Sequence, residues 1–89
     1  MNCEIIHRSR HAFERAITPE VIREVVSKGE IIASYPDDRP FPSALILGFD
    51  QARPIHVVAT RNAATSECYV DVPEPITLWD AAFKQRRSS

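Results

Sequence analysis

A proline-rich stretch runs directly into the most apolar stretch of this 89-residue chain. Residues 36–42 contain three prolines, whose nitrogens cannot donate hydrogen bonds to a β-ladder, so this stretch is predicted to be a loop. Residues 43–49 follow with the sequence SALILGF, which is apolar on both faces and is typical of a central strand. The sequence therefore predicts a stiff, charged loop at the mouth of the most buried strand of a sheet.

Three further segments are predicted to complete that sheet. Residues 30–35 indicate a short edge strand, residues 54–61 (PIHVVATR) a second central strand, and residues 66–72 a strand that pairs back onto it. The segments between these strands are short, and short connections are typical of antiparallel hairpins.

Three helices are predicted around the sheet. The clearest one covers residues 18–28, where Thr18 is a suitable N-cap, Pro19 fits the first turn and Gly29 marks the end. Residues 5–17 are predicted to form a first helix, and residues 78–87 a short final one.

These elements predict a single α+β domain over residues 1–89: two N-terminal helices, a four-stranded, mainly antiparallel sheet and a short C-terminal helix. We expect the helices to cover one face of the sheet and to leave the other face more open. His56 lies within an otherwise apolar strand and points away from the face that carries Ile55 and Val57.

The overall charge excludes a globally basic, nucleic-acid-binding surface. The formal net charge is -1, so any site for a polyanion must be a local cluster. No apolar run is long enough for a membrane span and the N-terminus lacks a signal peptide, which predicts a cytoplasmic protein. Cys3 and Cys68 match no metal-binding spacing, and we expect them to be two reduced thiols.

Four stretches of the chain carry a resemblance to a known family. They read IIHRSRHAFERAITPEVIREVV, GEIIASYPDDRPFPSALILGF, RPIHVVAT and PEPITLWDAAFKQRR. Together they resemble DUF4258, a family of small uncharacterised bacterial domains. The family characteristically begins with a helix of the pattern His-Ala-x-x-Arg-x-x-x-Arg-x-Ile-(Ser/Thr).

The family pattern can be aligned with this sequence in two registers. Counting back from the Ile-Thr pair without a gap places the family histidine on His7 and the second arginine on Arg15. His11 then stands where the family has its first arginine, and Arg8 where it has a small residue. The alternative register begins at His11 and reads Arg15 as the first arginine, but it needs a deletion of about one helical turn.

The resemblance implies a distant relation to the RelE/MqsR-like and BrnT-like toxins of bacterial toxin–antitoxin pairs. It implies a RelE-like architecture and a metal-independent endoribonuclease that uses no cofactor. It also implies a partner, an antitoxin of the zinc-finger or helix-turn-helix type, and RNA as the substrate.

RNA cleavage without a metal requires a base, an acid and a cation that stabilises charge on the phosphate. Histidine and arginine are suited to these roles near neutral pH. We expect His7 and His56 to act as acid and base and Arg15 to stabilise the phosphate. The candidates for substrate binding are Arg39, Tyr35, His11, Lys84 and Arg86, with Tyr35 or Phe41 stacking a base.

Each assignment has a plainer alternative. His56 can be a structural histidine within the strand, and His7 and His11 can be polar residues on a helix surface. His7 and His11 can also bind zinc, with His56 or an acid completing the site, although no HExxH or CxxC motif supports this. As a whole, the chain can be a non-catalytic interaction module, which its near-neutral charge favours.

Overall fold

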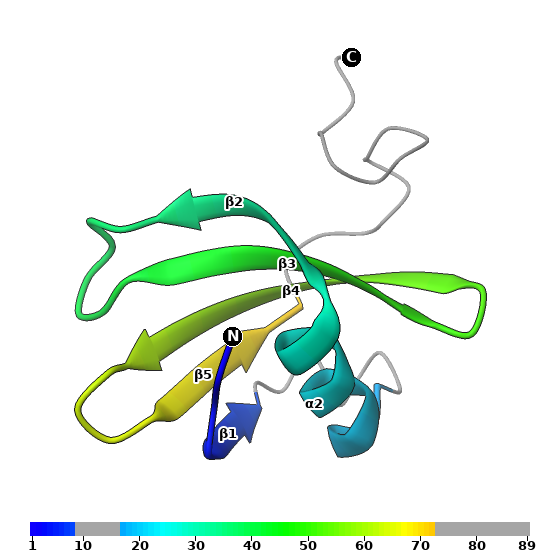
Figure 1. The fold of residues 1–89 in the computed structure, drawn as a ribbon, viewed down its shortest axis with the longest axis horizontal. Helices are drawn as coiled ribbons and strands as arrows, with labels where there is room; N and C mark the ends of the chain where they lie inside the picture. Colours follow the sequence, from blue (N-terminus) through cyan, green and yellow to red (C-terminus); the bar gives the residue numbers. More distant parts are fainter. Residues whose placement is uncertain (9–16, 73–89) are drawn as a thin grey trace.

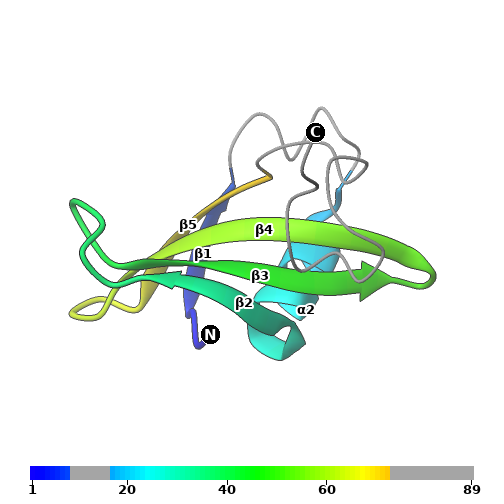
Figure 2. The same ribbon diagram turned by 90° about the horizontal axis from the view of Figure 1, so that it is seen from above.

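The computed structural model of the protein describes residues 1–8 and 17–72, which form a twisted five-stranded sheet with a helix on one face (Figures 1 and 2). The elements are β1 (Ile5–Arg8), α2 (Pro19–Lys28), β2 (Glu30–Tyr35), β3 (Ser43–Asp50), β4 (Arg53–Asn62) and β5 (Glu67–Asp71). Their order across the sheet is β1-β5-β4-β3-β2. Strands β2 to β5 follow one another as antiparallel neighbours, and β1 lies parallel to β5 at the edge.

Helix α2 begins and ends as its sequence predicts. The Thr18 hydroxyl accepts a hydrogen bond from the backbone N–H of Val21 (3.2 Å), and the N–H of Gly29 donates to the Val25 carbonyl (2.7 Å). Ile22, Val25 and Val26 are buried and form the face that packs on the sheet. The predictions of this helix and of strands over residues 30–35, 43–49, 54–61 and 66–72 are confirmed within one or two residues at each end.

We call the sheet face beneath α2 the inner face; it carries the main hydrophobic core (Figure 2). Alternate side chains of the central strands point to it, because successive residues of a strand face opposite ways. The inner-face core residues of the three central strands are Ala44, Ile46, Ile55, Val57, Ala59, Cys68 and Val70. Burial of this apolar surface against α2 is the principal stabilising contribution to the fold.

The outer face, which points away from α2, is buried at the centre of the sheet as well. Leu45 and Leu47 are each 5% exposed, and His56, the register partner of Leu47, is 2% exposed. The expectation of a more open second face is therefore wrong for this region. Toward the other end of the same face, Tyr35 and Tyr69 are 46% and 45% exposed.

The sequence prediction of the fold class is wrong in its helices and in its strand count. Residues 5–8 form strand β1 rather than the start of a helix, so the sheet is mixed and has five strands. Among the residues that the structure describes, α2 is the single helix. The predicted helix over residues 78–87, and residues 9–16 of the predicted first helix, lie outside the described residues.

A disulfide bond joins Cys3 to Cys68 across a sequence separation of 65 residues. The expectation of two reduced thiols is therefore wrong. Cys68 is fully buried in the core, and Cys3 packs against that core from the segment that precedes β1. The bond attaches the N-terminal segment to β5.

No helix within residues 1–8 and 17–72 is both long and apolar enough to cross a bilayer.

Candidate functional site

One row of residues crosses all five strands on the outer face. From edge to edge, through successive register partners, it consists of His7, Tyr69, Thr60, Ser43 and Tyr35. Register partners on neighbouring strands point to the same face, so the five side chains share one side of the sheet. We call them the outer-face row. It brings together His7 and Tyr35, two of the site residues predicted from the sequence.

At the β1 end of the row, His7 is paired with a carboxylate. Its Nε2 lies 2.9 Å from Oε2 of Glu67, and its ring stacks on Tyr69 with a centroid distance of 4.9 Å and an interplanar angle of 15°. The His7 side chain is 47% exposed and that of Glu67 28% exposed. The imidazole is thus oriented from two sides and still open to solvent.

The carboxylate of this pair is held in its ionised form. The hydrogen bond with His7, followed by a hydrogen bond with Thr65, lowers the pKa of Glu67 below its ordinary value of 4.5. An ionised carboxylate can only accept hydrogen bonds, so Nε2 of His7 carries the proton in this contact. When His7 is neutral, its Nδ1 is left as the basic nitrogen.

At the β2 end, the row meets the proline-rich loop. The Ser43 hydroxyl donates to Oδ2 of Asp38 (2.5 Å), and the backbone N–H of Arg39 donates to Oδ1 of the same carboxylate (3.2 Å). A shallow depression of about 590 Å³ lies here, between Tyr35, the loop and Val58. Arg39 therefore belongs to a loop that is hydrogen-bonded to the row at Ser43.

The structure does not bring His7 and His56 together. His7 is on β1 and His56 on β4, with β5 between the two strands. In register terms they are two strands and four residues apart, which corresponds to roughly 16 Å between backbones. Two groups that share one phosphodiester must both lie within hydrogen-bond reach of it. His56 is also almost fully buried, which favours the structural reading of this residue.

Four of the predicted site residues lie outside the described residues. They are His11, Arg15, Lys84 and Arg86. Their assignments stay predictions.

Sequence reasoning missed Glu67 and Tyr69, which make the closest contacts of His7. Both lie on the outer face of β5, two residues apart, and the sequence predicts this strand correctly, so their exposure could have been inferred. Their proximity to His7 could not, because residues 5–17 were read as a helix.

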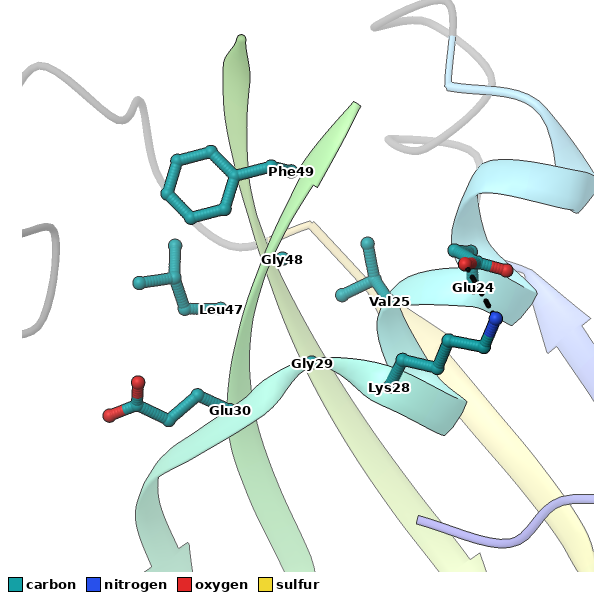
Figure 3. Close-up of a pocket in the computed structure, with 8 residues that line it drawn as sticks. All are labelled: Glu24, Val25, Lys28, Gly29, Glu30, Leu47, Gly48 and Phe49. Carbon is teal, nitrogen blue, oxygen red and sulfur yellow. Dashed lines mark ion pairs between the residues drawn. The ribbon is translucent and has the colours of Figure 1, made fainter. Parts of the chain in front are cut away.

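Two other candidate sites, a metal site and a surface hollow, do not compete with the outer-face row. Within residues 1–8 and 17–72 no three His, Cys, Asp or Glu side chains are grouped to hold a metal ion. A hollow of about 290 Å³ lies between the end of α2 and β3 (Figure 3). Its lining includes the exposed Glu24–Lys28 ion pair (3.2 Å) and Glu30, and the rest is backbone and apolar side chains. An exposed surface pair of this kind contributes little to stability, and no histidine or cysteine lines the hollow.

The fold and the site define a small domain with an exposed histidine–carboxylate pair on the face of a mixed sheet. The profile of the family described as "Domain of unknown function (DUF4258)" matches residues 7–70, well over half of the chain, and the chain belongs to this family. The matched range begins at His7 and contains the whole outer-face row. Comparisons with curated proteins and with solved structures found no match.

Proposed function

We propose that the outer-face row binds single-stranded RNA and that His7 is the general base for its metal-independent cleavage. The observation that carries the proposal is the exposed His7–Glu67 pair, with Nε2 and Oε2 2.9 Å apart. A histidine whose one nitrogen is fixed by an ionised carboxylate presents its other nitrogen as a base in a set direction, as in other His–carboxylate pairs.

The chemistry follows from that tautomer. Nδ1 of His7 takes the proton of a ribose 2′-OH, and the 2′ oxygen attacks the adjacent phosphorus. The bond from phosphorus to the 5′ oxygen breaks, water protonates the leaving oxygen, and the products are a 2′,3′-cyclic phosphate and a 5′-OH. Glu67 stabilises the imidazolium that forms at His7, and the imidazolium then returns its proton to solvent.

The rest of the row supplies binding. Tyr69 and Tyr35 expose aromatic rings on the same face, and bases of single-stranded RNA stack on such rings. The two tyrosines are three strand spacings apart, about 14 Å. Thr60 and Ser43 between them are partly buried and buried, so the two rings are the stacking surfaces that this proposal uses. Arg39 at one end supplies a cation that the row itself lacks, and Arg15, which we expect from its chemistry to hold the phosphate, lies outside the described residues.

The test compares conservative variants of the pair. Structured and unstructured RNA would be incubated with the purified protein in the presence of EDTA, and the product ends analysed. We expect His7→Gln to lower the cleavage rate by about 100-fold or more and Glu67→Gln by about tenfold. Glu4→Gln removes an exposed carboxylate before β1 and serves as the matched charge control. Equal rates for wild type and His7→Gln would overturn the assignment of the base.

The biological role that we propose is that of a toxin in a bacterial toxin–antitoxin pair, neutralised by a zinc-finger or helix-turn-helix antitoxin. The proposal draws on the family resemblance and on the acid–base pair. Its test is expression in a bacterial host. Growth arrest that is relieved by His7→Gln, and by co-expression of a small protein encoded in an adjacent reading frame, supports the role. Unimpaired growth with wild type contradicts it.

A second candidate is a non-catalytic module that binds a basic protein segment. The charge around the row favours it, since Asp38, Glu67 and Asp71 lie on or beside the outer face and the formal net charge is -1. The same RNA experiment separates the two functions. Absence of cleavage at high protein concentration, together with binding of an arginine-rich peptide that Tyr35→Ala weakens, would favour the module.

A further inference from the structure

We propose that the Cys3–Cys68 disulfide is a redox-sensitive latch for the His7–Glu67 pair. In this inference, reduction releases β1 from the sheet and carries His7 away from Glu67 and Tyr69. The inference deepens the proposed function, on which its meaning for catalysis rests, by naming a regulation of the same site. The release of β1 on reduction is independent of the proposed function and can be tested without RNA.

The disulfide lies directly at the pair that it is proposed to control. Cys68 is the residue between Glu67 and Tyr69 on β5, and it is the register partner of Ile6, next to His7 on β1. Cys3 is separated from the start of β1 by a single residue. The bond therefore joins the segment leading into β1 to the same short stretch of β5 that contacts the imidazole.

Strand β1 has few other attachments within the described residues. It has four residues, lies at the edge of the sheet and pairs with β5 alone. Three of its four residues are exposed, and Ile6 is the one that packs against the core. A short edge strand that buries so little apolar surface belongs to the least stable parts of a fold.

Hydrogen bonds add anchors both to β1 and to the segment before it. The Arg8 guanidinium donates to the Ile17 carbonyl (3.4 Å), and the backbone N–H groups of Glu4 and Ile5 donate to the Ser66 carbonyl (2.9 and 3.4 Å). Arg61 Nε donates to the Asn2 carbonyl (2.6 Å), Arg23 to the Cys3 carbonyl (3.4 Å), and the Met1 amino group to the Val26 carbonyl (2.8 Å). The Arg61 and Arg23 bonds are exposed to solvent, where water competes for the same groups and the net contribution is small. The Cys3–Cys68 bond adds a covalent constraint to these non-covalent contacts.

The redox step is a thiol–disulfide exchange with a dithiol reductant. A thiolate of the reductant attacks Sγ of Cys3, because Cys3 is partly exposed whereas Cys68 is fully buried. The Cys3–Cys68 bond breaks, Cys68 leaves as a thiolate that takes up a proton, and a mixed disulfide remains on Cys3. The second thiol of the reductant resolves it. The protein gains two electrons and two protons, and the dithiol becomes a disulfide.

The disulfide crosses the boundary of the family match. The match covers residues 7–70, which include Cys68 but not Cys3. The site residues and Cys68 thus lie in the matched range, whereas Cys3 precedes it.

The experiment records NMR spectra of the oxidised protein and of the protein reduced with dithiothreitol. We expect the ring contacts between His7 and Tyr69 to give cross-peaks in the oxidised state and to lose them on reduction. The cross-strand peaks between Leu47 and His56 on β3 and β4 should persist in both states. Cys3→Ser without reductant should behave like the reduced wild type, and dithiothreitol should change it no further, which controls for effects of the reductant.

Two results would overturn the latch. One is a His7–Tyr69 contact that survives reduction. The other is loss of the Leu47–His56 peaks together with it, which would make the disulfide a general stabiliser. RNA cleavage measured in parallel separates the two proposals. Cleavage by the oxidised protein that stops on reduction supports both. Release of β1 with no cleavage in either state keeps the latch and removes the ribonuclease. Cleavage that is unaffected by reduction, with the His7–Tyr69 contact intact in both states, removes the latch alone.

Discussion

The side chains of His7 and Glu67 meet at 2.9 Å although 60 positions separate them in the chain. The contact is diagonal across the parallel pair of β1 and β5, in which Ile5 is opposite Glu67 and His7 opposite Tyr69. Diagonal neighbours in a sheet are within reach of long side chains. Four residues in a parallel edge strand are thus enough to assemble an acid–base pair from the two ends of the domain.

Removing the Glu67 carboxylate should make the free energy of unfolding depend less on pH in the acidic range. The hydrogen bond from His7 lowers the pKa of Glu67 in the folded protein below 4.5, so its contribution to stability is complete above that pH. The contribution is lost as the pH falls through the lowered value. We therefore expect wild type to lose more stability than Glu67→Gln between about pH 5 and pH 3, in urea unfolding at a series of pH values. Glu4→Gln is the control and should keep the wild-type slope. Parallel profiles for wild type and Glu67→Gln would contradict this account.

The close approach of α2 to β3 at Gly48 predicts a rescue experiment (Figure 3). A Cβ at this position would lie 2.6 Å from Cγ2 and 2.9 Å from Cγ1 of Val25, so Gly48→Ala should cost about 1–3 kcal/mol of stability. Val25→Ala removes both Cγ atoms and leaves Cβ of this residue at 3.0 Å, so it should relieve most of the clash. The double variant should be more stable than the sum of the single effects by at least about 0.5 kcal/mol, measured by chemical denaturation.

Gly29 provides the matched control for that experiment. A Cβ there would meet the backbone carbonyl oxygens of Val25 and Leu47, the latter at 2.7 Å, which no side-chain truncation can remove. Val25→Ala should therefore fail to rescue Gly29→Ala. Equal rescue at both glycines would refute the steric explanation.

Tyr35 should affect RNA binding rather than the chemical step. It lies at the far end of the outer-face row from His7 and is 46% exposed. Loss of one stacked base costs about 1–3 kcal/mol, so Tyr35→Ala should raise KM by about 5- to 150-fold and leave kcat within about twofold. Phe49→Ala removes another exposed aromatic, outside the row, and should change neither. A fall in kcat with unchanged KM would place Tyr35 in a different role.

Substitution of His56 should lower the free energy of unfolding much more than substitution of His7. His56 is 2% exposed, and truncation of a buried side chain of this size to alanine costs about 2–4 kcal/mol. His7 has an exposed side chain, so His7→Ala should cost at most about 1 kcal/mol. Urea unfolding of the two variants measures both values. A marginal effect of His56→Ala would restore this residue as a functional candidate.

The elements that were predictable from the sequence are those with local signals. Helix α2 has its cap at Thr18 and its stop at Gly29, and β3 has an unbroken apolar run, so both were placed almost to the residue. Strand β1 has no such signal. The His7–His11 spacing suits a helix, and what makes residues 5–8 a strand is pairing with β5, which a local pattern cannot reveal.

The same distinction applies to the candidate site. His7 and Tyr35 were selected for their chemistry, but their alignment in one row depends on the registers of four strand pairs. Glu67 was overlooked because an isolated glutamate in a strand is unremarkable until its neighbour is known. The Cys3–Cys68 bond was missed for a similar reason, since a separation of 65 residues carries no spacing signal.

The position of β1 at the sheet edge also sets the order in which the domain can be built during synthesis. As the chain leaves the ribosome, β3, β4 and β5 can each pair with the strand made just before it, and such local pairings form quickly. Strand β1 is translated first but has no partner until β5 has emerged. The residue proposed as the base thus reaches its place last, and a nascent or truncated chain that lacks β5 carries His7 without the contacts that would make it reactive.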